Sequence, residues 1–354
     1  QKWNGWHYYF LDVVVVGGRV YTRKTGAKLG PWQEATMKLL AHTAKTYRKW
    51  LPNVRLVLSV LDEPYLERQR QPPLPLLSFM TSRGHWDIPV PSHAYFETSG
   101  GISSNKVKQD FAVWESPDWQ RRTAAAHPWE GRGGRAFFRG HDWDSSNSFT
   151  ELLPTRPEED CLERSPWGDS TSRPFGYRRW LASQSEPGEP LAGELDVGLT
   201  GAPSFVEAQH PGRKYAAPVP MEDHARHKYL LHLDGTTASN RLLKLLMLGS
   251  VVLKQDSVYQ EWFYRHLQPG VHFVAFERNR CSARNLTDTL AWLRQNDAAA
   301  RAIAAEGQRV ASTLFSTGAA ACYWQRLLAV YGSLQAFDPR TAVRLSDYTQ
   351  FKGQ

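Results

Sequence analysis

The sequence predicts an α/β protein with two domains, and three observations support this prediction. Short apolar runs rich in β-branched residues alternate with segments whose apolar residues recur at helical spacing. Strands separated by helices favour parallel pairing and a doubly wound sheet. The length of 354 residues suits two domains better than one, and 41% hydrophobic residues with 14 Trp can fill two sizeable cores.

The first predicted domain covers residues 1–130 and contains strands and one helix. Residues 6–21 hold two apolar strands around Gly17-Gly18, which predicts a hairpin. Apolar residues have helical spacing between 31 and 50. Two short apolar runs then predict buried strands, one over 54–62, ending in Asp62, and one over 74–80.

The second predicted domain covers residues 131–317, and its boundary is the Gly/Arg-rich stretch 131–134, which has the composition of a linker. The predicted strands are 135–140, 228–235, 250–254 and 271–276, and the predicted helices are 239–248, 260–267, 286–292 and 298–314. Residues 142–222 are rich in Pro, Ser, Gly, Asp and Glu, so we expect long surface loops with one or two helices. A last amphipathic helix, 322–334, belongs to residues 318–354, which we expect to pack back on the first domain.

Charge and targeting patterns narrow the class of protein. The 43 Lys and Arg exceed the 35 Asp and Glu, but they are scattered, so we expect a solvated basic surface and no nucleic-acid partner. No apolar run is long enough to predict a transmembrane helix. Because the chain begins at Gln1, we interpret it as a fragment or processed catalytic region, and a membrane anchor could lie outside it. The three cysteines have no metal-ligand spacing, and Asn285-Leu286-Thr287 is a glycosylation acceptor if the chain is secretory.

Three strand ends carry the candidate chemistry, because ligands of open α/β sheets bind beyond the carboxyl ends of the strands. They are Asp62, Arg139-Gly140 and the stretch 234–241, DGTTASNR. In that stretch a glycine turn, small hydroxyl residues and Arg241 are suited to hold a diphosphate. Ordinary helix capping is the alternative interpretation of the same residues.

Residues 228–276 resemble the core signature of glycosyltransferase family 90. The signature consists of a strand, a G-x-x-x-S-x-R turn, a helix, Gly-Ser, a second strand, an E-x-F/W-F/Y helix and L-x-P-x-x-H. Its elements here are Gly235, Ser239, Arg241, Gly249, Ser250, Lys254, Glu261, Phe263, Tyr264, Leu267, Pro269 and His272. Further stretches that resemble the family are 57–64, 76–96, 136–140, 286–311 and 322–331, so the resemblance covers most of the chain except 142–222.

The resemblance implies a GT-B enzyme, in which two Rossmann-like domains face a cleft, and an inverting transfer from UDP-glucose or UDP-xylose to a protein or glycan acceptor. It implies no metal or other cofactor and a location in the lumen of the endoplasmic reticulum or Golgi. Asp62 matches the catalytic base. The donor-binding positions are Ala136, Arg139, Gly140, Gly235, Thr236, Thr237, Ala238, Ser239, Asn240, Arg241 and Glu261. The positions near the sugar or acceptor are Gly100, Gly101, Trp86 and Asp87.

The role of Asp62 also has a physical basis that does not depend on the family. An inverting transfer needs one base to take the proton of the acceptor hydroxyl, and a carboxylate at the end of a strand is well placed for this. The alternative is that Asp62 caps a turn before Pro64.

Other groups offer competing chemistry. Asp142-Trp143-Asp144 is a D-x-D triplet, which binds a metal in GT-A enzymes, with a solvated turn as the alternative. His85, His93 and His127 are alternative bases, although such histidines are more often hydrogen-bonded structural residues.

The chain also departs from the family after the strand 135–140. His141 stands where the family often has a hydroxyl residue, Asn147 where it often has Arg, and Arg156 or Arg164 could substitute. A competing class is a carbohydrate- or polyanion-binding module that keeps the fold without the chemistry.

Overall fold

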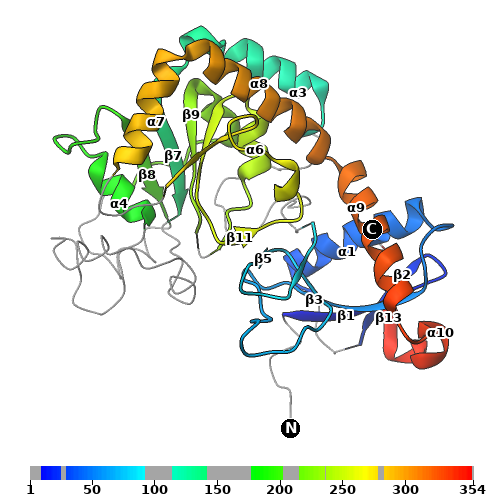
Figure 1. Ribbon diagram of the computed structural model, residues 1–354. Helices are drawn as coiled ribbons and strands as arrows, with labels where there is room; N and C mark the ends of the chain where they lie inside the picture. Colours follow the sequence, from blue (N-terminus) through cyan, green and yellow to red (C-terminus); the bar gives the residue numbers. More distant parts are fainter. Residues whose placement is uncertain are drawn as a thin grey trace. The chain divides into compact units, whose positions relative to one another are not determined.

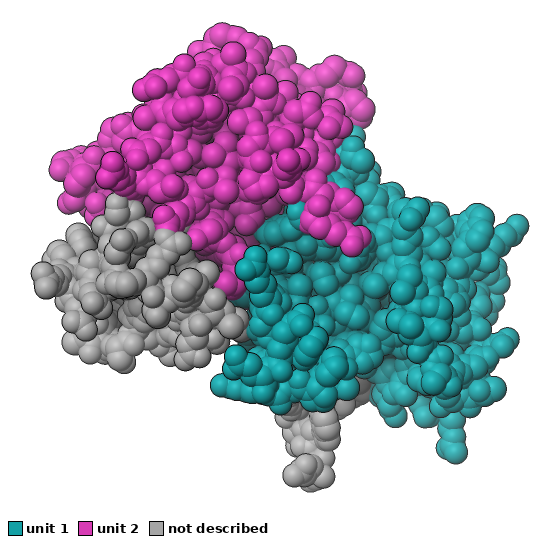
Figure 2. All heavy atoms as spheres, in the orientation of Figure 1, with its two compact units in different colours: residues 1–115, 259–264, 313–354 teal, residues 116–258, 265–312 magenta. Residues whose placement is uncertain are grey.

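The computed structural model describes residues 9–24, 29–91, 114–141, 177–201, 215–235, 237–277 and 283–352. The chain forms two compact units, one of residues 1–115, 259–264 and 313–354 and one of residues 116–258 and 265–312 (Figure 2). The units change at 115/116 and 312/313, whereas the sequence predicted boundaries at 130/131 and 317/318. No helix among the described residues is long and apolar enough to cross a membrane.

The first unit contains a six-stranded mixed sheet in the order β13-β2-β1-β3-β4-β6 (Figure 1). Its strands are β1 (Phe10–Val16), β2 (Arg19–Arg23), β3 (Val54–Ser59), β4 (Leu76–Ser78), β6 (Ile88–Pro89) and β13 (Tyr348–Gln350). The predicted hairpin of β1 and β2 is confirmed, and its turn needs glycine because Gly17 and Gly18 have φ of 58° and 70°. From β3 to β6 the strands are parallel, so their carboxyl ends meet at one edge.

Two long helices complete the core of the first unit. They are α1 (Pro31–Thr46) and α9 (Thr317–Leu334); the smaller elements are β5 (Thr81–Ser82), which pairs with β11 (Tyr259–Gln260), α10 (Pro339–Ala342) and the 3₁₀ turn η8 (Leu345–Asp347). Proline at its first position suits the start of α1, where Gln33 also accepts a hydrogen bond from the backbone of Gly30 at 2.6 Å. Leu40 of α1, Leu58 of β3 and Trp324 of α9 are fully buried in one core.

The second unit contains a five-stranded sheet in the order β12-β10-β9-β7-β8, in which every neighbouring pair is parallel. Its strands are β7 (Gly133–His141), β8 (Leu195–Thr200), β9 (His227–His232), β10 (Val251–Gln255) and β12 (Val274–Phe276). Its helices are α3 (Pro117–Ala126), α4 (Tyr177–Gln184), α6 (Leu242–Met247), α7 (Arg284–Gln295) and α8 (Asp297–Leu314), with 3₁₀ turns η3 (Trp129–Gly131) and η6 (Met221–Arg226). A further 3₁₀ turn, η7 (Tyr264–His266), lies where the chain passes from the first unit to the second. The α/β class predicted from alternating strands and helices is therefore confirmed, and all carboxyl ends of this sheet meet at one edge.

Four local expectations were wrong. Residues 142–222 were expected to hold loops and one or two helices, but they also contain the strand β8, which pairs with β7. The stretch 131–134 is no linker, because Gly133 and Gly134 begin β7. Residues 260–267 form the end of β11 and the turn η7 instead of one helix. The strand expected over 54–62 ends at Ser59, so Asp62 lies in a bend that follows β3.

Candidate functional site

Two arginines lie beside one buried ring at the carboxyl edge of the second sheet. Arg241, the residue directly before α6, donates from Nη1 to the backbone oxygen of Arg139 at 2.6 Å. Arg178, on α4, donates to the backbone oxygens of His141 at 2.9 Å and Leu233 at 2.8 Å. Both guanidinium carbons lie 5.2 Å from the ring centre of Phe138. The two cations are therefore fixed to the ends of β7 and β9.

Glycine at position 140 allows this approach. A Cβ atom at Gly140 would lie 2.7 Å from Cζ of Phe138 and 3.0 Å from Nη2 of Arg241. Any larger residue would displace the ring or the guanidinium, because real Cβ contacts are almost never that short. Close packing thus explains why the second residue of the predicted Arg139-Gly140 pair is glycine.

The turn between β9 and α6 is mostly buried. The backbone N–H of Gly235 donates to the oxygen of Thr237 at 2.9 Å, and Nε2 of His232 contacts the oxygen of Ser239 at 2.9 Å. Thr237, Ala238 and Ser239 are buried and Asn240 is exposed, while Thr236 lies outside the described residues. Because α6 begins at Leu242, Arg241 precedes the helix and does not belong to its first turn.

Two arginine cations lie at this edge, together with the buried carboxylate of Asp234, which follows β9. Burial, and then the charge of Arg178, lower the pKa of Arg241 to about 9, which leaves it a cation at neutral pH. Burial, followed by the charges of Arg241 and Arg178, lowers the pKa of His141, so this ring is neutral there. Among the described residues, no ion pair involves Arg241. Two adjacent cations with this environment favour an anion.

Two other predicted donor-binding residues, Arg139 and Ala136, contact residues of the second unit itself. Arg139 forms an ion pair with Asp196 of β8 at 2.6 Å and lies 4.6 Å from the ring centre of Phe137. Its backbone oxygen, which accepts from Arg241, is its contribution to the arginine pair. Ala136 is fully buried in the core of the second unit.

Glu261 lies in the first unit, apart in the chain from the other predicted donor residues. Glu261 belongs to the segment 259–264, which is part of that unit. The strand β11 in this segment pairs with β5. Glu261 is 6% exposed, between the buried residues Tyr259 and Trp262.

Asp62 is exposed, in a bend after β3 that is held on both sides. Before it, the N–H of Leu61 donates to Oγ of Ser59 at 3.3 Å. After it, Pro64 is buried, and the backbone oxygen of Leu66 accepts a hydrogen bond from the N–H of Trp86 at 2.8 Å. The carboxylate predicted as a base is therefore accessible to solvent on an anchored segment.

The positions expected near the sugar or acceptor are divided. Nε1 of Trp86 donates to the oxygen of Gln71 at 3.1 Å, and the guanidinium of Arg68 lies 4.0 Å from the Trp86 ring centre. Asp87 is 4% exposed and accepts hydrogen bonds from within its own unit. Gly100 and Gly101 lie outside the described residues.

The competing chemistry has little support among the described residues. His85 is 2% exposed and its Nδ1 lies 2.7 Å from Oγ of Ser82, which indicates a structural role. His127 ends α3, where its backbone oxygen accepts from Arg132. His93, the residues 142–144, and Asn147, Arg156 and Arg164 lie outside the described part of the chain. Within the described part, no three His, Cys, Asp or Glu residues group to hold a metal.

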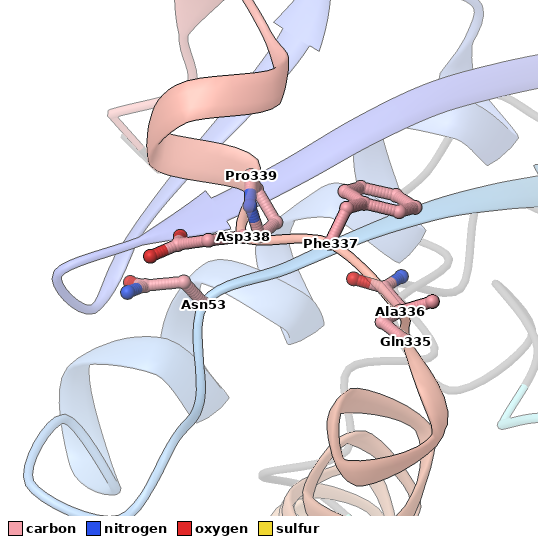
Figure 3. Close-up of a pocket in the computed structure, with 6 residues that line it drawn as sticks. All are labelled: Asn53, Gln335, Ala336, Phe337, Asp338 and Pro339. Atoms are coloured by element: carbon pink, nitrogen blue, oxygen red, sulfur yellow. The ribbon is translucent and has the colours of Figure 1, made fainter.

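A cavity of about 390 Å³ lies elsewhere in the first unit (Figure 3). It is lined by Asn53, Gln335, Ala336, Phe337, Asp338 and Pro339. Asn53 precedes β3 whereas Asp62 follows it, so the cavity is at the opposite edge of the sheet. Its polar side chains already serve the fold: Asn53 accepts from the N–H of Gly17 at 2.9 Å, and Asp338 accepts from Nη2 of Arg340 at 2.7 Å. We therefore do not assign a ligand to it.

Comparisons with known proteins give a family. Residues 7–350 match the profile of Glycosyl transferase family 90. Protein O-glucosyltransferase 3 of Homo sapiens is 27% identical over 336 residues, covering 93% of this chain and 56% of the relative. O-glucosyltransferase rumi of Drosophila pseudoobscura pseudoobscura is 27% identical over 291 residues, covering 81% of this chain and 62% of the relative.

The chain thus spans somewhat more than half the length of these curated relatives. Among solved structures, HepE of Anabaena in complex with UDP-glucose has 13% identity and a TM-score of 0.34, over 64% of this chain and 56% of that chain. The profile match extends over nearly the whole sequence and includes both units, and on that ground the chain belongs to glycosyltransferase family 90.

Proposed function

We propose that this chain is an inverting glycosyltransferase that transfers glucose or xylose from a UDP-sugar to a hydroxyl group of a protein or glycan. The single observation that carries the donor half of this proposal is the pair of guanidinium groups beside Phe138. Membership in glycosyltransferase family 90 and the names of the relatives, which are O-glucosyltransferases, support the reaction type.

In the proposed reaction Arg241 and Arg178 bind the diphosphate of the donor. An arginine has five N–H donors; Arg178 donates to the backbone oxygens of His141 and Leu233, and Arg241 donates to that of Arg139. Charge-assisted hydrogen bonds from such groups to phosphate oxygens are strong and directional.

The chemical step is a displacement at the anomeric carbon. The acceptor oxygen forms a bond to that carbon as the bond to the UDP oxygen breaks, and the electron pair of that bond leaves with UDP. Asp62 takes the proton of the acceptor hydroxyl, and the arginine pair stabilises the negative charge that UDP gains. These residues can perform the transfer without a metal, and we propose a metal-independent enzyme in the lumen of the secretory pathway.

The base is tested by Asp62→Asn, with Glu63→Gln as the matched control because both carboxylates are exposed in the same bend. The assay is hydrolysis of UDP-glucose and UDP-xylose, which needs no acceptor other than water. We expect Asp62→Asn to lose the rate, by about 10²-fold or more for a general base, while Glu63→Gln keeps it. A normally folded Asp62→Asn protein with most of its rate would refute the assignment.

The donor class is tested by ligand-induced stabilisation. UDP should raise the melting temperature of the chain and ADP should not, because only a ligand that binds the folded state stabilises it. Equal shifts with the two nucleotides would remove the UDP-sugar claim. Loss of activity with EDTA and recovery with Mn²⁺ would instead favour a metal at residues 142–144.

The second candidate is a carbohydrate- or polyanion-binding module that has lost the chemistry. The net charge of +8 and the 14 Trp suit this function as well. Binding of UDP without any hydrolysis, unchanged in Asp62→Asn, would favour the module over the enzyme.

A further inference from the structure

One buried carboxylate connects three segments of the first unit. Oδ1 of Asp87 accepts hydrogen bonds from the N–H of Tyr65 at 2.9 Å and from Oγ of Ser78 at 2.6 Å. Oδ2 accepts from the N–H of Leu66 at 2.7 Å. Both oxygens are used, and the residue is 4% exposed, so the Asp87 carboxylate is not placed to bind a sugar from solvent.

The two backbone donors belong to the segment that carries Asp62. Tyr65 and Leu66 follow Asp62 by a few residues, and Pro64, which lies between Asp62 and Tyr65, is buried. Ser78 is the last residue of β4, which runs parallel to β3 in the same sheet. Asp87 therefore fastens the segment after Asp62 to the sheet at its carboxyl edge, while Ser59 holds the N–H of Leu61 on the other side.

We infer that Asp87 is a positioning residue that fixes the 61–66 segment and thereby the place of the Asp62 carboxylate. This inference rests on the proposed function, because the place of Asp62 matters only if Asp62 is the base. A base must reach the reacting hydroxyl within hydrogen-bond distance, and a displacement of about 1 Å can cost about 10²-fold in rate. Asp87 acts here through two backbone amides, so it affects the reaction without touching the donor.

The first variant is Asp87→Asn, which keeps the size of the side chain. One carboxylate oxygen becomes an amide nitrogen, so an N–H donor then faces another N–H donor at Tyr65 or Leu66. We expect kcat for hydrolysis of UDP-glucose to fall by at least about tenfold, since only the base is displaced. KM for UDP-glucose and the melting shift with UDP should stay unchanged, because the proposed donor residues Arg241 and Arg178 belong to the second unit.

The matched control is Ser78→Ala. It removes one hydrogen bond from the same carboxylate but leaves both bonds to the 61–66 segment. If Asp87 only stabilised the fold, kcat would be unchanged in both variants, provided that both are folded at the assay temperature. A positioning role lowers kcat in Asp87→Asn and leaves it at the wild-type value in Ser78→Ala.

Amide hydrogen exchange measures the positioning directly. Exchange at Tyr65 and Leu66 should become faster in Asp87→Asn and stay slow in Ser78→Ala. If Asp87→Asn does not fold, Pro64→Gly loosens the same segment with Asp87 in place, and we expect the same fall in kcat at constant KM.

The outcomes separate this inference from the proposed function. If Asp62→Asn keeps the wild-type rate, or if the wild type hydrolyses no UDP-sugar, the base and the positioning role are both wrong. If Asp62→Asn loses the rate while folded Asp87→Asn or Pro64→Gly keeps its kcat, only the positioning role is wrong. A fall in kcat of Asp87→Asn with unchanged exchange at Tyr65 and Leu66 would also overturn it.

Discussion

The substitution Gly140→Ala adds one methyl group at the point where the arginine pair approaches β7. The added carbon would lie 2.7 Å from Cζ of Phe138 and 3.0 Å from Nη2 of Arg241, so the ring or the guanidinium must move. Overpacking of this kind costs about 1–3 kcal/mol of folding free energy. A guanidinium that no longer meets its phosphate oxygen loses a charged hydrogen bond worth about 1.5–3 kcal/mol, or about 10- to 150-fold in the Kd of UDP.

The matched control lies in the same strand. A Cβ atom at Gly134 would meet no atom within 4 Å, so Gly134→Ala should leave both stability and UDP affinity unchanged. Titration calorimetry with UDP at one fixed salt concentration compares the two variants with the wild type. At a UDP concentration of about 100 times the wild-type Kd, the wild type gains about 2.7 kcal/mol of stability, and a tenfold weaker variant gains about 1.4 kcal/mol.

A folded Gly140→Ala protein whose Kd for UDP stays within about twofold of the wild-type value would refute this reasoning. The loss of one charged hydrogen bond should raise the Kd by about tenfold or more. UDP would then bind away from the carboxyl end of β7. Equal weakening in Gly134→Ala would show that the strand as a whole, and not the contact with Arg241, controls the affinity.

Three further substitutions test other parts of the structure. Arg178→Ala should raise the Kd of UDP by about 10- to 150-fold in calorimetry, whereas Arg135→Ala, an exposed cation on β7, should not. Burial raises the pKa of Asp12, but the hydrogen bond and charge of Arg55, with two weaker donors, bring it below the usual 3.8. Asp12 therefore stabilises the fold above that pH and loses this effect as the pH falls through its folded pKa, so Asp12→Asn should cost more stability at pH 6 than at pH 2 in urea unfolding. Trp324→Ala should cost about 3–5 kcal/mol of unfolding free energy in the same assay, because the side chain is fully buried in the first core.

Much of the fold could be predicted from periodicity because its strands and helices have strongly patterned apolar residues. Residues 228–235 and 250–254 were predicted as buried strands, and β9 (His227–His232) and β10 (Val251–Gln255) lie there in the parallel sheet. The strand before Asp62 was extended too far because the apolar pattern continues through Val60 and Leu61, after the pairing with β1 and β4 has ended. Hydrophobicity alone does not show where backbone pairing stops.

The candidate site was only partly accessible from the sequence. Gly140 could be found because it lies near the carboxyl end of the apolar run that forms β7, and Arg241 because it lies in the short motif between β9 and α6. Arg178 was missed because it belongs to a region whose composition indicates loops, although Tyr177 and Leu181 on α4 already have the spacing of a buried helix face. Its two bonds, to the oxygens of His141 and Leu233, depend on contacts that no local pattern encodes.

Asp87, in contrast, was predicted as a site residue from its motif. Its place in a motif that resembles the family suggested a contact with sugar or acceptor, but both of its oxygens bind the protein itself. A carboxylate within a motif can thus serve the fold, and only the hydrogen-bond partners distinguish the two roles.

A crystal structure of the chain with bound UDP tests the proposed donor site most directly. We expect diphosphate oxygens within hydrogen-bond distance of the guanidinium groups of both Arg241 and Arg178. An ordered UDP bound elsewhere, with neither arginine within reach of a phosphate, would contradict it.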